Sequence, residues 1–149
     1  MPAAPTWTVT IDASPEKVWP WVADLGKHTD WSPKPYRVEW LSGEPNAVGS
    51  TFRSVGWLPN DKSHAMEGRI AKSEPQKVFE VVSHDDKQEW TNRYELARSG
   101  AQTSVTKTMT GPPLTVVQKA IYAVALAVFV RGAVQKGLNM LKTKVEGSA

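Results

Sequence analysis

The best candidates for binding or catalysis in this sequence are polar side chains on the apolar faces of predicted strands. Three of them follow the two-residue period of their apolar neighbours: His64, Asn92 and Lys107. Tyr94, two residues after Asn92, adds a hydroxyl that can donate or accept a hydrogen bond. A polar group facing the interior must be satisfied by protein, water or a ligand. We therefore expect these groups to orient the polar head of a bound molecule, to pair with one another, or to lie at strand ends near solvent.

Aromatic and methionine side chains form the second group of candidates. Seven tryptophans are many for 149 residues, and their large rigid faces suit flat apolar ligands through stacking and edge contacts. The same rings also serve as ordinary core packing. The residues predicted to bind a ligand are Trp31, Trp40, Trp57, His64, Met66, Trp90, Asn92, Tyr94, Met109 and Phe129. No catalytic residue is assigned.

The sequence lacks the residue spacings typical of metal sites, phosphate-binding loops and activated nucleophiles. The three histidines, at 28, 64 and 84, do not form an H-x₃-H or H-E-x-x-H pattern, and there is no cysteine, so we expect no metal and no cofactor. There is no G-x-S-x-G sequence and no phosphate-binding glycine loop. Serine and threonine are numerous, but nothing marks one of them as an activated nucleophile.

Length and charge narrow the class of protein. We expect residues 1–149 to form one domain. The net charge is +3 and no run of five or more lysines and arginines occurs, so nucleic acid is not an expected partner. The first residues have no basic region followed by an apolar one, and cysteine is absent. A cytoplasmic protein is therefore predicted.

The N-terminal third predicts a strand followed by two short helices. Trp7, Val9 and Ile11 alternate with threonines, as in a half-buried strand. Ser14 is a typical N-cap and precedes a proline at the first helical position. Pro20 should shorten or bend this helix. A second helical turn is expected through 26–31.

The middle of the chain alternates short strand patterns with polar turns. The spacing predicts an antiparallel meander of about seven strands, including the first. The further strands are expected at 36–40, 51–58, 63–73, 77–83, 89–97 and 103–110.

The C-terminal region predicts one long helix, since no proline follows Pro113 and apolar residues recur on one face to Val145. If unbroken it would be about 50 Å long. The stretch Leu114 to Val130 is apolar on more than one face, which predicts a second contact, either a homodimer or a peripheral membrane surface. Its eleven consecutive apolar residues, 120–130, are too few to span a bilayer.

Short motifs along nearly the whole chain carry a family resemblance. In order, they are Ala13-Ser14-Pro15-Glu16-Lys17-Val18-Trp19, Asp24-Leu25, Trp31-Ser32-Pro33, Gly49-Ser50-Thr51-Phe52, Glu89-Trp90, Tyr94-Glu95-Leu96 and Leu138 to Glu146. Their order and spacing resemble the START-like (helix-grip, SRPBCC) superfamily and, more narrowly, its polyketide cyclase/dehydrase and lipid-transport family. The resemblance implies an α+β fold, in which a curved antiparallel sheet wraps around a long C-terminal helix and leaves an apolar pocket between them.

Two functions follow from the resemblance. The first is binding or carrying a hydrophobic small molecule, such as a lipid, a polyketide or another ring-containing ligand. The alternative is a cofactor-independent polyketide cyclase, aromatase or dehydratase. There the acid or base would be His64, Tyr94 or an inward arginine, with Asn92 positioning the substrate.

Overall fold

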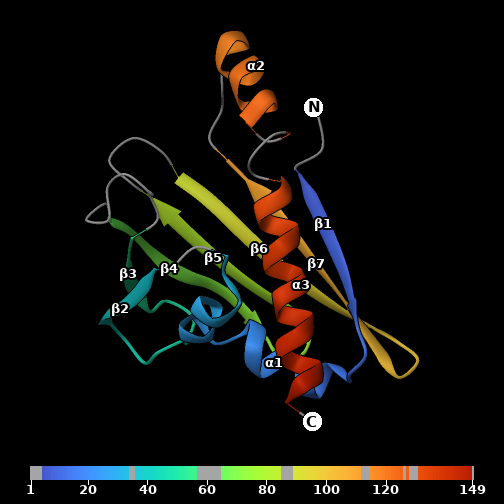
Figure 1. Ribbon diagram of the computed structural model, residues 1–149. Coiled ribbons are helices and arrows are strands. Elements are labelled where there is room, and N and C mark those ends of the chain that lie inside the picture. The colour runs from blue at the N-terminus through green and yellow to red at the C-terminus, as the bar shows by residue number, and fades with distance from the viewer. Residues whose placement is uncertain are drawn as a thin grey trace.

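A curved seven-stranded antiparallel sheet wraps around the C-terminal helix α3 (Arg131–Gly147) (Figure 1). The computed structural model describes residues 5–33, 36–56, 65–84, 89–111, 115–125, 127 and 131–148. Within these residues the strand order is β1-β7-β6-β5-β4-β3-β2. The predicted α+β helix-grip fold is confirmed.

Strands β2 to β7 form an antiparallel meander, and β1 pairs with β7. The strands are β1 (Thr6–Ile11), β2 (Arg37–Ser42), β3 (Thr51–Val55), β4 (Ala65–Glu74), β5 (Val78–His84), β6 (Glu89–Ser99) and β7 (Gln102–Thr110). In β1 the apolar residues Trp7, Val9 and Ile11 are buried and the threonines between them are exposed. This alternation puts one face of β1 on the core, as the two-residue period predicted.

Two short helices follow β1 and pack beside α3 (Figure 1). Helix α1 (Pro15–Val22) has Ser14 at its N-cap and contains Pro20. The 3₁₀ helix η1 (Leu25–Trp31) follows after two residues. Leu25, His28 and Trp31 are its buried residues, and their spacing of three matches the three residues per turn of a 3₁₀ helix.

Helix α3 packs against β1 and η1 through Leu138, Leu141 and Val145, all buried. Gly137 allows α3 to approach η1 closely, since a Cβ there would lie 3.3 Å from the Trp31 carbonyl oxygen. Near the C-terminal end of the helix, Glu146 accepts a hydrogen bond of 2.8 Å from the Asp12 backbone N–H. Close packing beside Gly137 and this hydrogen bond both place α3 against the N-terminal segment.

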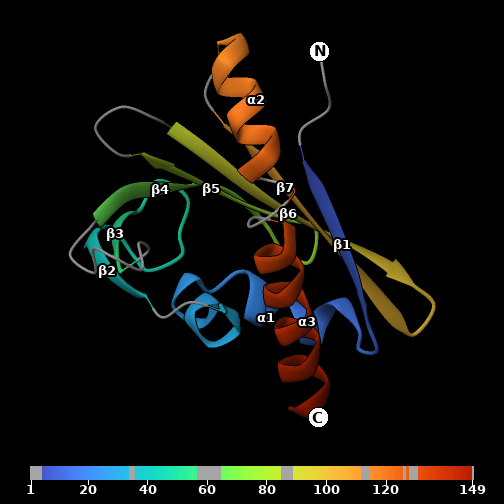
Figure 2. The ribbon, with the colours of Figure 1, turned by 45° about the horizontal axis from the view of Figure 1, so that its top comes forward.

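Among the described residues, the C-terminal region forms two helices, α2 (Val116–Ala125) and α3, where the sequence predicted one long helix. Helix α2 precedes α3 and projects beyond the end of the sheet (Figure 2). Helix α3 has 17 residues, or about 25 Å at ~1.5 Å per residue, half the length expected for an unbroken helix. In the described part of the chain, no helix is both long and apolar enough to span a membrane.

Candidate functional site

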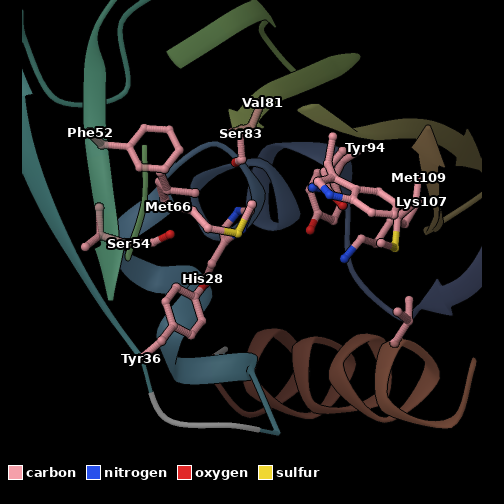
Figure 3. Close-up of a pocket in the computed structure, with 15 residues that line it drawn as sticks. His28, Tyr36, Phe52, Ser54, Met66, Val81, Ser83, Tyr94, Lys107 and Met109 are labelled. Atoms are coloured by element: carbon pink, nitrogen blue, oxygen red, sulfur yellow. The ribbon is translucent and has the colours of Figure 1, made fainter. Parts of the chain in front are cut away.

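A cavity of about 260 Å³ lies between the sheet, η1 and α3. Side chains from η1, α3 and six of the strands converge on it (Figure 3). The described lining residues are Leu25, His28, Tyr36, Val38, Phe52, Ser54, Met66, Val81, Ser83, Trp90, Asn92, Tyr94, Lys107, Met109 and Val134. Of these, only Val134 comes from α3, so η1 closes the cavity together with the C-terminal helix.

Strand register assembles the wall of the cavity from cross-strand pairs. Tyr94 on β6 lies opposite Lys107 on β7, and Asn92 lies opposite Met109. Ser83 on β5 pairs with Trp90 on β6 in the same way. Side chains at paired positions of an antiparallel sheet project on the same face. The pairing therefore brings residues far apart in sequence onto one concave surface.

A glycine makes room for the apolar part of this wall. Phe52 on β3 lies opposite Gly68 on β4. A Cβ at position 68 would lie 2.7 Å from the Phe52 ring and 2.5 Å from the Val82 carbonyl oxygen. Trp40 packs edge-on against the same Phe52 ring, with 5.9 Å between centroids. Phe52 is therefore fixed from two directions.

His28 is a buried imidazole on η1 that also lines the cavity. Its Nε2 lies 2.6 Å from the carbonyl oxygen of Val22, the last residue of α1. Because a carbonyl only accepts, Nε2 carries the proton and Nδ1 of the neutral ring is an acceptor. Burial lowers the pKa of His28 to about 4, while the hydrogen bond to Val22 acts in the opposite direction. The ring is neutral near physiological pH.

Hydrogen bonds made by Asp24 and Asn46 fix the start of η1, the helix that carries His28. The Asp24 carboxylate at the N-cap of η1 accepts hydrogen bonds from the Gly26 N–H at 3.0 Å and the Asn46 side-chain amide at 3.2 Å. The Asn46 amide oxygen accepts one from the Leu25 N–H at 2.7 Å. Asn46 has φ +69°, a left-handed conformation that asparagine tolerates better than most residues. The turn before β3 therefore determines where η1 begins.

An aromatic cluster supports His28. The Trp31 ring lies 4.5 Å from the His28 ring and 5.8 Å from the Tyr94 ring, between centroids. The Trp31 indole N–H donates to the Trp21 carbonyl oxygen at 3.3 Å. Trp31 is buried, with 5% of its surface exposed. It positions two cavity residues without being one of the lining residues described.

Lys107 is the cation of the cavity lining. It is half-buried on β7, and its Nζ lies 5.3 Å from the centroid of the Tyr94 ring. Figure 3 shows its amine directed into the space bounded by the sheet and α3. Burial lowers the pKa of Lys107 to about 8, so the ammonium form still dominates near neutral pH. The described lining residues include no aspartate or glutamate.

Two tyrosines contribute hydroxyl groups that stay protonated. Burial raises the pKa of both Tyr36 and Tyr94 above the ordinary tyrosine value. Both residues line the cavity, where a neutral phenol can donate or accept a hydrogen bond.

The structure brings together five of the ten residues predicted to bind a ligand. Met66, Trp90, Asn92, Tyr94 and Met109 all line the cavity. Lys107, predicted to face inward with them, does so too. Ligand binding by these residues remains a prediction.

The other five predicted residues are not among the described lining residues. Trp31 and Trp40 are not among the lining residues and instead support His28 and Phe52 from behind. Trp57, His64 and Phe129 lie outside the described residues.

Several lining residues were not predicted, His28 foremost among them. The three-residue spacing of Leu25, His28 and Trp31 is the signal that could have identified it, because it marks one face of a 3₁₀ helix. Tyr36, Ser54 and Ser83 also line the cavity. Short polar residues on strands give no comparable signal, since either face can hold them.

Residues 5–146, almost the whole chain, match the family described as polyketide cyclase/dehydrase and lipid transport. The chain belongs to this family. No curated protein sequence matches it.

Solved structures share the fold of this family member at low sequence identity. A protein from Thermus thermophilus has a TM-score of 0.73 at 16% identity, with 99% of each chain covered. Ara h 8.0201 has a TM-score of 0.69 at 12% identity, with 97% of each chain covered. DynU16, a protein of the dynemicin biosynthetic locus, has a TM-score of 0.65 at 15% identity, covering 98% of this chain and 48% of its own. At these identities the similarity concerns the fold alone.

Proposed function

We propose that the chain binds a compact hydrophobic small molecule in the cavity between the sheet, η1 and α3. The observation that carries this proposal is a cavity of about 260 Å³ with mostly apolar walls and a few polar groups. Family membership supports it, because the family description includes lipid transport.

The composition of the wall matches the way proteins bind apolar ligands. Phe52, Met66, Val81 and Met109 supply apolar and polarisable contact surface. Asn92 and the other polar lining residues are few, and such groups orient a ligand within an apolar site. The volume lies just below the range of about 300–1,000 Å³ for drug-sized ligands. The ligand is therefore a small one, with one or two rings or a medium-length acyl chain.

Binding of a neutral apolar probe tests the proposal. We would titrate the protein with N-phenyl-1-naphthylamine and follow its fluorescence, with native mass spectrometry to count bound molecules. Val134→Trp should fill the cavity from α3 and weaken binding by about tenfold or more. The matched control is Val124→Trp on α2, where Val124 is exposed and is not a lining residue.

Either of two results would overturn the proposal. One is the absence of probe binding by the unmodified protein. The other is binding that Val124→Trp weakens as much as Val134→Trp does, because the probe would then lie on the surface and not in the cavity. Small molecules extracted from freshly purified protein would identify the natural ligand class.

Cyclase or dehydratase activity is the second candidate function. It is favoured by two proton-transfer groups that line one cavity: neutral His28, whose Nδ1 can accept a proton, and Lys107, whose pKa is about 8. Tyr94→Phe separates the two functions. Intact affinity with lost turnover of a polyketide substrate would indicate an enzyme, whereas weaker binding with no product would indicate a carrier.

A further inference from the structure

Among the described residues, Lys107 is a cavity-lining cation with no carboxylate partner. Its cross-strand partners are Trp7 on β1 and Tyr94 on β6, and its neighbours two residues along the same face are Val105 and Met109. In the part of the chain that the structure describes, Lys107 takes part in no ion pair. Its ammonium lies over the Tyr94 ring, and, besides burial, its charge lowers the pKa of His28. A half-buried ammonium in such surroundings is only partly compensated.

The neighbouring strand β1 carries a buried donor without an acceptor among the described residues. The Trp7 indole N–H is buried and has no hydrogen-bond partner in the described part of the chain. The Arg131 guanidinium at the start of α3 lies 5.8 Å from the centroid of the Trp7 ring, and Arg131 belongs to none of the ion pairs described. Trp7 therefore has Arg131 against its ring and Lys107 as its cross-strand partner, and neither cation belongs to an ion pair among the described residues.

We propose that the ligand of this cavity is a compact hydrophobic carboxylic acid whose carboxylate binds the Lys107 ammonium. The amide of Asn92, which lines the cavity one inward position from Tyr94, supplies a further donor. The hydrocarbon part lies against the apolar wall. This inference rests on the proposed function and adds the charge of the ligand to it.

A carboxylate suits the site better than a phosphate. Phosphate recognition in proteins usually relies on arginine forks or on several backbone N–H groups. The described lining residues include one lysine and no arginine. A single ammonium is a point charge, which one carboxylate balances.

The test compares acids with their own methyl esters. We would titrate the full chain with 2-naphthoate, octanoate and decanoate, and with the methyl ester of each, by calorimetry or native mass spectrometry. The unmodified protein should bind at least one acid about tenfold or more tighter than its ester, the factor expected for one hydrogen bond to a charged group. Lys107→Met should abolish this preference, so that acid and ester bind with affinities within about twofold of each other.

Three further variants control the comparison. Lys144→Met removes an exposed lysine of α3 and should keep the preference, because it changes net charge alone. Lys107→Arg should keep part of the preference, since the positive charge remains. Lys107→Gln serves if Lys107→Met does not fold, as judged by thermal unfolding of each variant.

The outcomes separate this inference from the proposed function. Equal binding of acid and ester by the unmodified protein, or a preference that survives Lys107→Met, overturns the carboxylate inference and leaves hydrophobic binding in place. Failure of N-phenyl-1-naphthylamine and of every acid and ester to bind overturns both. Tighter binding of octyl phosphate than of octanoate would replace the carboxylate with a phosphate.

Discussion

Helices α2 and α3 follow one another in the chain and have opposite environments. Helix α2 is the more apolar of the two in sequence, yet Val116, Val117, Ile121 and Val124 are each more than 60% exposed. Helix α3 carries lysines, glutamine and asparagine, yet it buries Leu141 completely. The difference shows that hydrophobic content does not decide burial. A helix packs when its apolar residues form one stripe and a partner surface faces that stripe.

The largest effect should come from the buried stripe of α3. We expect Leu141→Ala to lower the free energy of unfolding by about 2–5 kcal/mol, because it leaves a void at a fully buried position. The matched change on α2, Ile121→Ala, should cost less than about 0.5 kcal/mol, since Ile121 is 65% exposed. Chemical denaturation of both variants measures the contrast. Equal losses would show that α2 is buried in solution.

We expect acidic pH to lower the free energy of unfolding through His28 on η1, the helix that packs against α3. The folded pKa of His28, about 4, lies below its ordinary value of 6.5. The unfolded chain therefore binds more protons between these values, and stability falls as pH drops from 6.5 toward 4, by up to about 3 kcal/mol. The charged or titratable groups around it are Lys107, Tyr94 and Asp24.

Denaturation midpoints across this pH window measure the acid effect. His28→Gln should flatten the pH dependence. The matched control is His84→Gln, at an exposed position on β5. An unchanged slope in His28→Gln would mean that the imidazole is accessible to solvent protons in the folded state.

Two glycines of α3 differ in how closely a neighbouring segment packs against them. A Cβ at Gly132 would meet no atom within 4 Å, whereas one at Gly137 would lie 3.3 Å from the Trp31 carbonyl oxygen. Gly132→Ala should stabilise the protein by about 0.5–1 kcal/mol through helix propensity. Gly137→Ala should gain less or destabilise, because η1 must shift. Thermal unfolding ranks the two, and a larger gain at 137 would contradict the close contact.

The smallest stability effect should come from the apolar surface of α2. We expect Val117→Ser combined with Ile121→Ser to change unfolding free energy by less than about 0.5 kcal/mol. The same variant tests the second contact predicted for residues 114–130, a homodimer or a membrane surface. Its mass in solution and its co-sedimentation with liposomes should both be compared with those of the unmodified protein. A monomer that ignores liposomes before and after the change would contradict both contacts.

Local pattern alone predicted much of the fold and part of the site. The alternation in β1 and the inward positions of Asn92, Tyr94 and Lys107 agree with the structure. Both could be predicted because the direction of side chains along a strand alternates with a period of two residues. The N-cap at Ser14 is likewise encoded within a few residues. Where a structure depends only on near neighbours, the sequence determined it.

Tertiary structure decided which of these residues share a cavity. Trp31 and Trp40 look like ligand-binding residues in sequence, but they pack behind His28 and Phe52. His28 enters the cavity because Asn46, on a distant turn, holds the start of η1. Likewise, α2 is exposed and α3 is packed, although the sequence predicted both as parts of one long C-terminal helix. Each outcome depends on contacts between segments far apart in the chain, which periodicity does not specify.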